Sequence, residues 1–441
     1  RVSTRNMAMS RQKKLDKMDV IELAAEKPKP EFHFRYGRTP GKMLFETHDL
    51  VIGYDEPLSK PLNFTMERGQ KIALVGTNGI GKTTLLKLIK NELAPAGEKS
   101  GEILYNGKSI DSLSLRESAC AIGFVGQNPD NQIVTDKVWH ELSFGLENLG
   151  VPQNVIRRRV GEMASYFGIQ DWFRKKTDEL SGGQKQLLNL ASVMVMQPKL
   201  LILDEPTSQL DPIAAADFIA TLKKLNTEFG ITVLLVEHRL EDVFPIADKV
   251  LLMENGCVLL YDSPRAVGKN LKKINPEHPM LKGLPSAVRL YNLLSSDEVC
   301  PLTVKEGQEF FRRNFKRNID FSDGDKSEYS DKTDTAIELK NVWFRYERDL
   351  PDILRGVNLK ADRGEIICIL GGNGTGKTTM LNVISGLNKP YRGKIKIDGK
   401  KIKDYKGNSL YRKKLAYLPQ NPQTVFLKDT VSGDLEEMLK A

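Results

Sequence analysis

The chain has 441 residues, of which 40% are hydrophobic and 28% charged, and it carries a formal net charge of +9. This length predicts two or three domains with their own cores. No apolar run approaches about 18 residues, which excludes a segment that spans a membrane by itself. The four cysteines are scattered and include no C-x-x-C pair, which argues against both disulfides and a cysteine metal site. With no signal peptide after Arg1, the sequence predicts a cytoplasmic protein and a fragment of a longer one.

Residues 1–42 form a basic arm that holds eleven Lys and Arg against five Asp and Glu. Residues 1–25 are predicted to form a charged helix, which ends at the Pro-rich segment 27–30. Such a local excess of positive charge indicates contact with a polyanion such as RNA. A solvated arm without a partner is the alternative.

A glycine-rich loop follows the β-rich segment that begins at Met43. The segment from Gly76 to Thr83 fits G-x-x-x-x-G-K-[ST] and comes directly after the apolar run 71–75. A strand, a glycine loop and a helix form a phosphate-binding unit, in which backbone N–H groups and the helix N-terminus face phosphate oxygens. Lys82 would reach the β- and γ-phosphates, and the Thr83 hydroxyl would bind Mg²⁺. The nucleotide-binding candidates are Gly76, Asn78, Gly79, Gly81, Lys82, Thr83 and Thr84.

Three polar segments downstream complete a candidate site for phosphate chemistry. Asp204 and Glu205 end the apolar run 200–203, where Asp204 could hold Mg²⁺ and Glu205 could orient or deprotonate a water. Ser181, Gly182, Gly183 and Gln184 open a helix and predict a second phosphate-binding amide cluster. His238 closes another apolar run and could sense the γ-phosphate. The plainer interpretations are a helix-start acid pair, a common turn and a satisfied polar histidine.

The order of elements predicts an α/β domain. Apolar runs at 200–203, 233–236 and 250–253 are typical of buried parallel strands, and long helical segments at 184–197 and 213–229 separate them. The polar stretch 285–334 predicts a linker.

The second half repeats the opening of the first. The segment from Gly371 to Thr378 has the same loop pattern 295 positions later, after the apolar run 365–370. Tyr346 and Gln420 lie at distances from this loop similar to those of Tyr54 and Gln127 from the first loop. The tyrosine rings could stack on adenine, with core packing as the alternative. The absence of an Asn-Lys-x-Asp string favours ATP over GTP. The candidates in this half are Tyr346, Gly371, Asn373, Gly374, Gly376, Lys377, Thr378, Thr379 and Gln420, with Thr378 and Gln420 also as Mg²⁺ ligands.

Taken together, these motifs resemble the ATP-binding cassette (ABC) family of P-loop ATPases. The resemblance implies a mostly parallel sheet with an antiparallel β subdomain and a helical subdomain. It also implies that two cassettes meet head to tail, so that each ATP lies between one phosphate loop and the other cassette's Leu-Ser-Gly-Gly-Gln. In the family's terms, Gln127 and Gln420 would link the γ-phosphate and its Mg²⁺ to a partner protein.

Within that family, residues from about 94 to 441 resemble the ATPases of energy-coupling-factor and cobalt-type importers. The strings that carry this resemblance are 126–132, 139–142, 237–241 and 419–422. The resemblance implies ATP hydrolysis that drives uptake through a transmembrane subunit and a substrate-binding membrane subunit. It also implies a location at the inner face of the cell membrane. A second ABC domain would come from the same chain or from a homodimer.

Residues 1 to about 80 instead resemble ABC-F translation factors, in the segment 6–18, the Pro-rich break and the segment 49–55. This resemblance implies a ribosome or tRNA partner contacted through residues 1–42. The sequence therefore predicts a chimera of two reading frames, with an importer ATPase that has an unusual basic arm as the alternative.

The expected domains are an arm at 1–42, a first nucleotide-binding domain at 43–284, a linker at 285–334 and a second domain at 335–441. By the spacing of the first domain, the second domain's signature and carboxylates would fall beyond Ala441. We therefore expect one full cassette and a truncated one, neither composite site complete, and apolar strand edges exposed in the second half.

Overall fold

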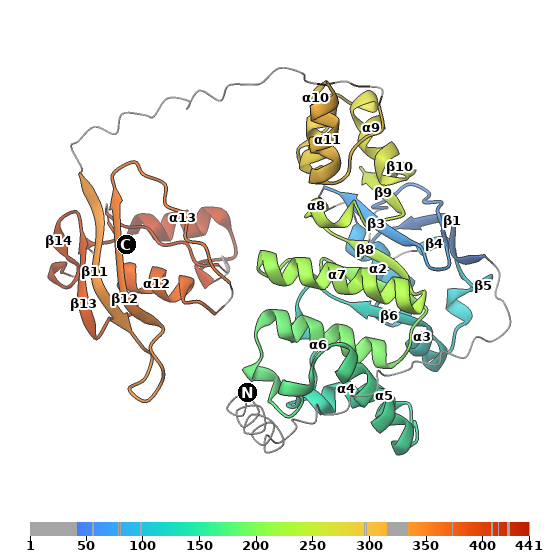
Figure 1. The fold of residues 1–441 in the computed structure, drawn as a ribbon, viewed down its shortest axis with the longest axis horizontal. Helices are drawn as coiled ribbons and strands as arrows, with labels where there is room; N and C mark the ends of the chain where they lie inside the picture. The colour runs from blue at the N-terminus through green and yellow to red at the C-terminus, as the bar shows by residue number, and fades with distance from the viewer. Residues whose placement is uncertain are drawn as a thin grey trace, which may run out of the picture.

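The computed structural model describes residues 42–314 and 334–440, apart from gaps at 55–56, 78, 80, 98, 295, 297, 373, 407–408, 413 and 421–423. The described residues form two α/β units (Figure 1). None of the helices in these ranges has both the length and the apolar character that crossing a membrane requires. The basic arm at 1–41 and its predicted helix lie outside the described residues.

A six-stranded sheet lies at the centre of the first domain, in the order β10-β9-β3-β8-β7-β6. Neighbouring strands are parallel except for the β9–β10 pair. Every residue of β7 and β8 is buried, which explains why these strands read as apolar runs without alternation. The strands are β3 (Lys71–Gly76), β6 (Ile122–Val125), β7 (Leu200–Asp204), β8 (Thr232–Val236), β9 (Lys249–Glu254) and β10 (Cys257–Asp262). The predicted parallel α/β sheet is confirmed.

A second, antiparallel sheet of the same domain has the order β2-β1-β4-β5. Its strands are β1 (Met43–Ile52), β2 (Thr65–Glu67), β4 (Lys99–Tyr105) and β5 (Lys108–Ser109). Phe45 and Ile103 of this sheet share one core cluster with Ile72 of the parallel sheet. The two sheets are therefore packed on a common core, as expected for an antiparallel β subdomain.

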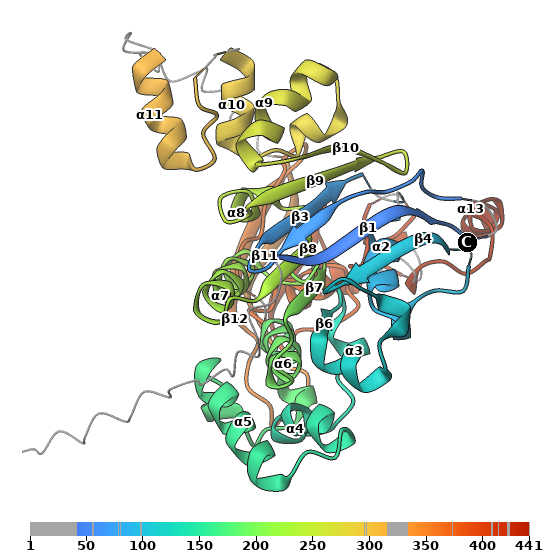
Figure 2. The same ribbon diagram turned by 90° about the vertical axis from the view of Figure 1, so that its right-hand side faces the viewer.

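Figure 2 shows α7 on the left of the parallel strands and α2 on their right, with α4 and α5 below the strands and α9 above them. The helix α7 begins after Asp211, whose carboxylate accepts two backbone N–H bonds, and ends at Gly230 with φ of 64°. The helices are α2 (Lys82–Ile89), α3 (Leu115–Ala121), α4 (Val138–Asn148), α5 (Gln153–Tyr166), α6 (Gly182–Val195), α7 (Pro212–Phe229), α8 (Leu240–Val243) and α9 (Pro264–Ile274).

The predicted linker at 285–334 is wrong for residues 285–314. Two helices occupy this stretch, α10 (Ser286–Leu294) and α11 (Val304–Asn314). Val288, Tyr291 and Phe310 are buried in the same core as the parallel sheet. The helix α10 is largely apolar, but α11 and residues 315–333 are rich in charge, so the average composition of the whole stretch concealed both helices. Residues 315–333 lie outside the described part of the chain.

The second domain repeats the antiparallel sheet, in the order β12-β11-β13-β14. Its elements are β11 (Thr335–Phe344), β12 (Leu354–Asp362), α12 (Lys377–Ile384), β13 (Arg392–Ile397), β14 (Lys400–Lys401) and α13 (Val431–Lys440). The apolar run 365–370 is not a strand, contrary to the prediction, and Ile366 is 96% exposed. In the first domain the equivalent β3 lies between β8 and β9, and among the described residues of the second domain no strand flanks this run. Exposed apolar residues were expected here.

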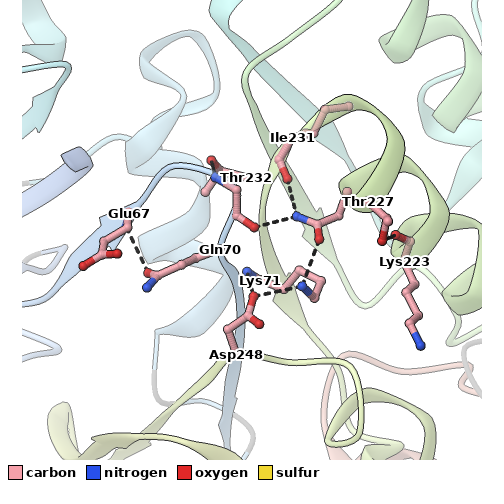
Figure 3. Close-up of polar contacts among 10 residues, drawn as sticks. Glu67, Gln70, Lys71, Lys223, Thr227, Ile231, Thr232 and Asp248 are labelled. Carbon is pink, nitrogen blue, oxygen red and sulfur yellow. Dashed lines mark hydrogen bonds and ion pairs between the residues drawn. The ribbon is translucent and has the colours of Figure 1, made fainter. Parts of the chain in front are cut away.

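A polar network joins the N-terminal ends of the parallel strands to the end of α7. Figure 3 shows Lys71 beside Asp248, with Ile231 and Thr232 at the start of the neighbouring strand. The Asn226 amide donates to the carbonyls of Gly69 and Ile231, each at 2.7 Å, and accepts from the Lys71 ammonium at 2.9 Å. Asn226 thus satisfies backbone carbonyls that the strands leave unpaired.

We expect Asn226→Ala to lower the free energy of unfolding by about 2 kcal/mol, because two carbonyls lose their donor. Chemical denaturation measures this change. Thr227→Ala is the matched control, since the Thr227 hydroxyl bonds the Lys223 carbonyl on the exposed side of the same helix, and it should change stability by less than about 0.5 kcal/mol. Equal effects of the two substitutions would contradict the structural role of Asn226.

Candidate functional site

The first phosphate loop has the backbone that its glycines predict. Gly79 and Gly81 have φ of 79° and 83°, which disfavours residues with a Cβ, and Gly81 is the N-cap of α2. Lys82 is 5% exposed, and its ammonium donates to the Gly76 carbonyl at 2.6 Å. Burial lowers the pKa of Lys82, while the carboxylates of Glu205 and Asp204 oppose that shift. The ammonium is therefore held inside the loop. Asn78 lies outside the described residues.

Thr83 and Asp204 lie together as the Mg²⁺ prediction requires. The Thr83 hydroxyl donates to the Asp204 carboxylate at 3.1 Å. Asp204 is buried at the carboxyl end of β7; burial raises its pKa, with a further contribution from the Glu205 charge. A hydroxyl and a carboxylate oxygen suit a hard divalent cation, which keeps phosphate and water as its other ligands. The described ranges hold no cluster of three His, Cys, Asp or Glu side chains suited to a metal.

The other two predicted catalytic residues, His238 and Gln127, both contact Glu205. Its carboxylate lies 2.8 Å from His238 Nε2 and accepts from the Gln127 amide at 3.3 Å. Its backbone has φ of 47°, a left-handed conformation rare outside glycine, and its N–H donates to the Val236 carbonyl at 3.0 Å. The turn after β7 thus fixes the carboxylate between two strand ends. His238 contacts this carboxylate, a contact that the predicted γ-phosphate role did not include.

Sequence reasoning missed a buried pair beside these residues. Glu237 is 3% exposed, and its carboxylate accepts from the Thr207 hydroxyl at 2.7 Å and from the Thr207 N–H at 3.0 Å. Burial raises the pKa of Glu237, while the bonds from Thr207 oppose that shift. The pair ties the segment after β7 to the end of β8, and so holds Glu205 and His238 in register. The sequence did contain one indication of this pair, since Glu237 directly precedes the predicted His238.

The predicted Ser181–Gln184 segment lies at the start of α6, whereas Lys82 begins α2. The Ser181 hydroxyl accepts from the Gln184 N–H at 3.3 Å, and the Gln184 side chain accepts from the Ser181 N–H at 3.0 Å. A Cβ on Gly183 would come within 3.3 Å of the Ala214 methyl group, and a Cβ on Gly182 within 4.0 Å of the Gln209 carbonyl. These glycines allow the N-terminus of α6 to pack closely against that of α7.

The second phosphate loop faces the same region. A Cβ on Gly372 would lie 3.9 Å from the carboxylate of Asp211, the N-cap of α7 (Figure 1). Lys377 donates to the carbonyls of Gly371 and Gly372 at 2.8 and 2.6 Å, as Lys82 does to Gly76. Gly374 and Gly376 have φ of 79° and 90°, matching the first loop. Thr378 and Gln420 are exposed, and Asn373 lies outside the described residues.

The two tyrosines occupy equivalent places at the two loops. The hydroxyl of Tyr54 shares a hydrogen bond with that of Thr84, and Tyr346 does so with Thr379, both at 3.3 Å. The residues are 45% and 57% exposed, so the core-packing alternative is wrong. Both rings remain accessible to a flat ligand above the loop.

The chain is similar to several known proteins. The family model described as ABC transporter matches residues 59–208 and 354–437. A putative ABC transporter ATP-binding protein of Bacillus thuringiensis is 40% identical over 85% of this chain and 67% of its own length. One of Methanosarcina acetivorans is 32% identical over 89% of this chain and 67% of its own. The solved structure of cbiO1 from Clostridium perfringens, part of the ABC transporter complex cbiONQ, is 34% identical, with a TM-score of 0.48 over 55% of this chain and 98% of that chain.

Proposed function

We propose that this chain, which belongs to the ABC transporter family and is an ATP-binding ATPase subunit of a transporter, energises substrate uptake through a separate membrane partner. In this proposal it acts as the energy-coupling-factor and cobalt-type importer ATPases do. The observation that carries the ATPase mechanism is the Glu205 carboxylate, held by His238 and Gln127 beside the Lys82 loop.

The residues of the first domain have distinct tasks in hydrolysis. The loop N–H groups and Lys82 bind the triphosphate, and Tyr54 stacks on the adenine. Thr83 and Asp204, with Gln127, would hold Mg²⁺, which neutralises phosphate charge when bound. Glu205 accepts a hydrogen bond from the attacking water and takes its proton, while His238 keeps the carboxylate aimed at that water.

We also propose which parts form each composite ATP site. The second loop, with Lys377, pairs with Ser181–Gln184, because both approach the segment 209–211. The Lys82 loop takes its opposing signature from another ABC domain, in a longer form of this chain or in a homodimer. The described residues of the second domain supply Tyr346, Lys377 and Gln420 to its site, and those of the first domain supply Glu205 to the site at Lys82.

The surface from Gly126 to Trp139 is our proposed contact for the transmembrane subunit. Lys185 pairs with Asp130 at 2.6 Å, and Gln132 accepts from the Gly126 N–H at 2.7 Å, so the segment after Gln127 is braced. Directly beyond it, Val134 and Trp139 are 67% and 41% exposed. A rigid polar segment with exposed apolar residues at its end, joined to the catalytic Gln127, suits a protein partner. The substrate-binding membrane subunit would then join through that transmembrane subunit.

We expect Trp139→Ala to lower retention of the full chain on membranes that carry the transmembrane subunit by at least about tenfold, as truncation of a buried aromatic at an interface does. Sedimentation of tagged protein with these membranes, followed by detergent solubilisation and affinity purification, measures the retention. Leu293→Ala is the matched control, because Leu293 is 78% exposed on α10, away from this surface. Retention of wild-type protein on ribosomes alone, lost after ribonuclease treatment, would overturn the importer proposal.

The ABC-F alternative rests on residues 1 to about 80, and residues 1–41 lie outside the described part of the chain. The relatives compared above carry the name of ABC transporter ATP-binding proteins and match 85–89% of this chain. The chimera and the ribosome or tRNA partner therefore stay predictions without support from these relatives. Copurification of ribosomal RNA that depends on residues 1–42 is the result that would favour them.

A further inference from the structure

The two antiparallel sheets have the same register, so their residues can be compared one by one. Glu46 of β1 pairs with Thr65 on one side and Leu104 on the other, and His48 pairs with Glu102. In the second domain, Glu338 of β11 pairs with Lys360 and Lys396, and Lys340 pairs with Lys394. The next strand continues the match, since Leu104 pairs with Ser109 and Lys396 pairs with Lys401. Glu46 therefore corresponds to Glu338.

At five positions around that shared glutamate, the second sheet has lysine where the first has another residue. We call these residues the lysine face: Lys340, Lys360, Lys394, Lys396 and Lys401, in place of His48, Thr65, Glu102, Leu104 and Ser109. Directly paired residues lie on the same side of an antiparallel sheet, and so do alternate residues of one strand. Leu339, Ile395 and Ile397 between them are buried in the core, so the lysine face lies on the outer side.

The lysines are not needed for the fold, and the carboxylates that the structure places beside them, Glu338 and Asp362, neutralise them only in part. The first sheet forms the same pairing with Thr65, Glu102 and Ser109. Glu338 bonds Lys340 at 2.7 Å and lies 3.2 Å from Lys396, which leaves one carboxylate between two ammonium groups. Lys360 lies 3.3 Å from Asp362. Lys394 and Lys401 are exposed, and the structure shows no carboxylate within ion-pair distance of either among the residues it describes.

We propose that the lysine face binds the anionic lipid headgroups of a membrane surface. Neighbouring strands are about 4.8 Å apart and alternate residues about 6.8 Å apart, so the five ammonium groups form a flat array rather than a groove. A flat array of hydrated point charges suits diffuse attraction to a charged leaflet. The choice of lipid over other polyanions rests on the proposed function, which places the chain at a membrane.

A nucleic acid fits this face less well. Single strands are bound by grooves with exposed aromatic rings on which bases stack. The aromatic residue nearest to the lysine face along the paired strands is Trp343, whose indole N–H donates to Asn341 at 2.9 Å and whose ring has the Arg392 guanidinium 5.8 Å from its centroid. That ring is already occupied by side chains of the same sheet.

The test replaces lysines by the residues that the first sheet carries at the same positions. The variant Lys360→Thr, Lys394→Glu, Lys401→Ser keeps the Glu338 pairs. The control Lys60→Thr, Lys175→Glu, Lys223→Ser makes the same changes at exposed lysines of the first domain. Sedimentation of the full chain with phosphatidylcholine vesicles containing about 30% phosphatidylglycerol, in about 0.05 M salt, measures binding. We expect a loss on the order of 10²-fold for the first variant and little change for the control, since each near-surface lysine contributes about fivefold.

Further results decide the proposal. Thr65→Lys, Glu102→Lys, Ser109→Lys should give the first sheet vesicle affinity, which a merely unfolded variant cannot mimic. ATP hydrolysis should be unchanged in all these variants, so that failure of the lipid proposal is separable from failure of the proposed function. Unchanged vesicle binding by the lysine-face variant would overturn the proposal. So would a selective loss of RNA binding with vesicle binding intact, which would assign the face to nucleic acid.

Discussion

Glu205→Gln is expected to lower ATP turnover by a factor on the order of 10²–10⁴, while leaving ATP affinity within a few-fold of wild type. An amide of the same shape cannot take a proton from water and loses the charge that His238 faces at 2.8 Å. The phosphate loop and the Thr83–Asp204 pair stay in place, so binding is preserved. Phosphate release under saturating Mg-ATP, together with a nucleotide-binding titration, separates the two effects.

Asp217→Asn is the control for this substitution. Asp217 is an exposed carboxylate on α7, in the same domain and outside the cluster around Lys82. Its conversion to an amide should leave turnover unchanged. Normal turnover by Glu205→Gln would show that another group activates the water, and the role assigned to this carboxylate would be wrong.

Lys82→Ala should weaken nucleotide binding by at least about 10²-fold, because a charge-assisted contact with the phosphates is lost. Lys82 is 5% exposed and its ammonium already lies inside the loop, bonded to the Gly76 carbonyl, so little ordering is needed when the ligand binds. Titration with a fluorescent ATP analogue measures the affinity of the first site if the second loop carries Lys377→Ala in both proteins compared.

Lys223→Ala in the same background is the control, since Lys223 is exposed on α7. It removes an identical charge at a distance from the loop and should leave the affinity as it was. Circular dichroism of the Lys82 variant shows whether the loop still folds. Wild-type affinity in a folded Lys82→Ala protein would contradict the phosphate-binding role.

Local features of this fold were predictable because short-range physics determines them. The glycines of each loop require positive φ at Gly79, Gly81, Gly374 and Gly376, and the structure has it at all four. The runs at β7 and β8 are apolar because both faces of a parallel sheet are buried. The residues at the ends of such strands meet at one edge, which is why Asp204, Glu205 and His238 could be placed together.

Features that depend on pairing over long distances were not predictable. The apolar run 365–370 has the composition of a strand, but a strand forms only where another strand lies beside it. The Glu237–Thr207 pair joins residues thirty positions apart, and the helices α10 and α11 pack on a core whose other residues come from elements distant in the sequence. The lysine face could not be predicted either, because its members lie on four different strands and only the pairing register shows that they are neighbours.

Calorimetric titration of the purified full chain with Mg-ATP tests the central claim most directly. If main-chain N–H groups and Lys82 hold a triphosphate, saturable heat of binding appears for wild-type protein and disappears when both loop lysines are replaced. Absence of any binding heat, from protein whose circular dichroism shows a native fold, would contradict the account.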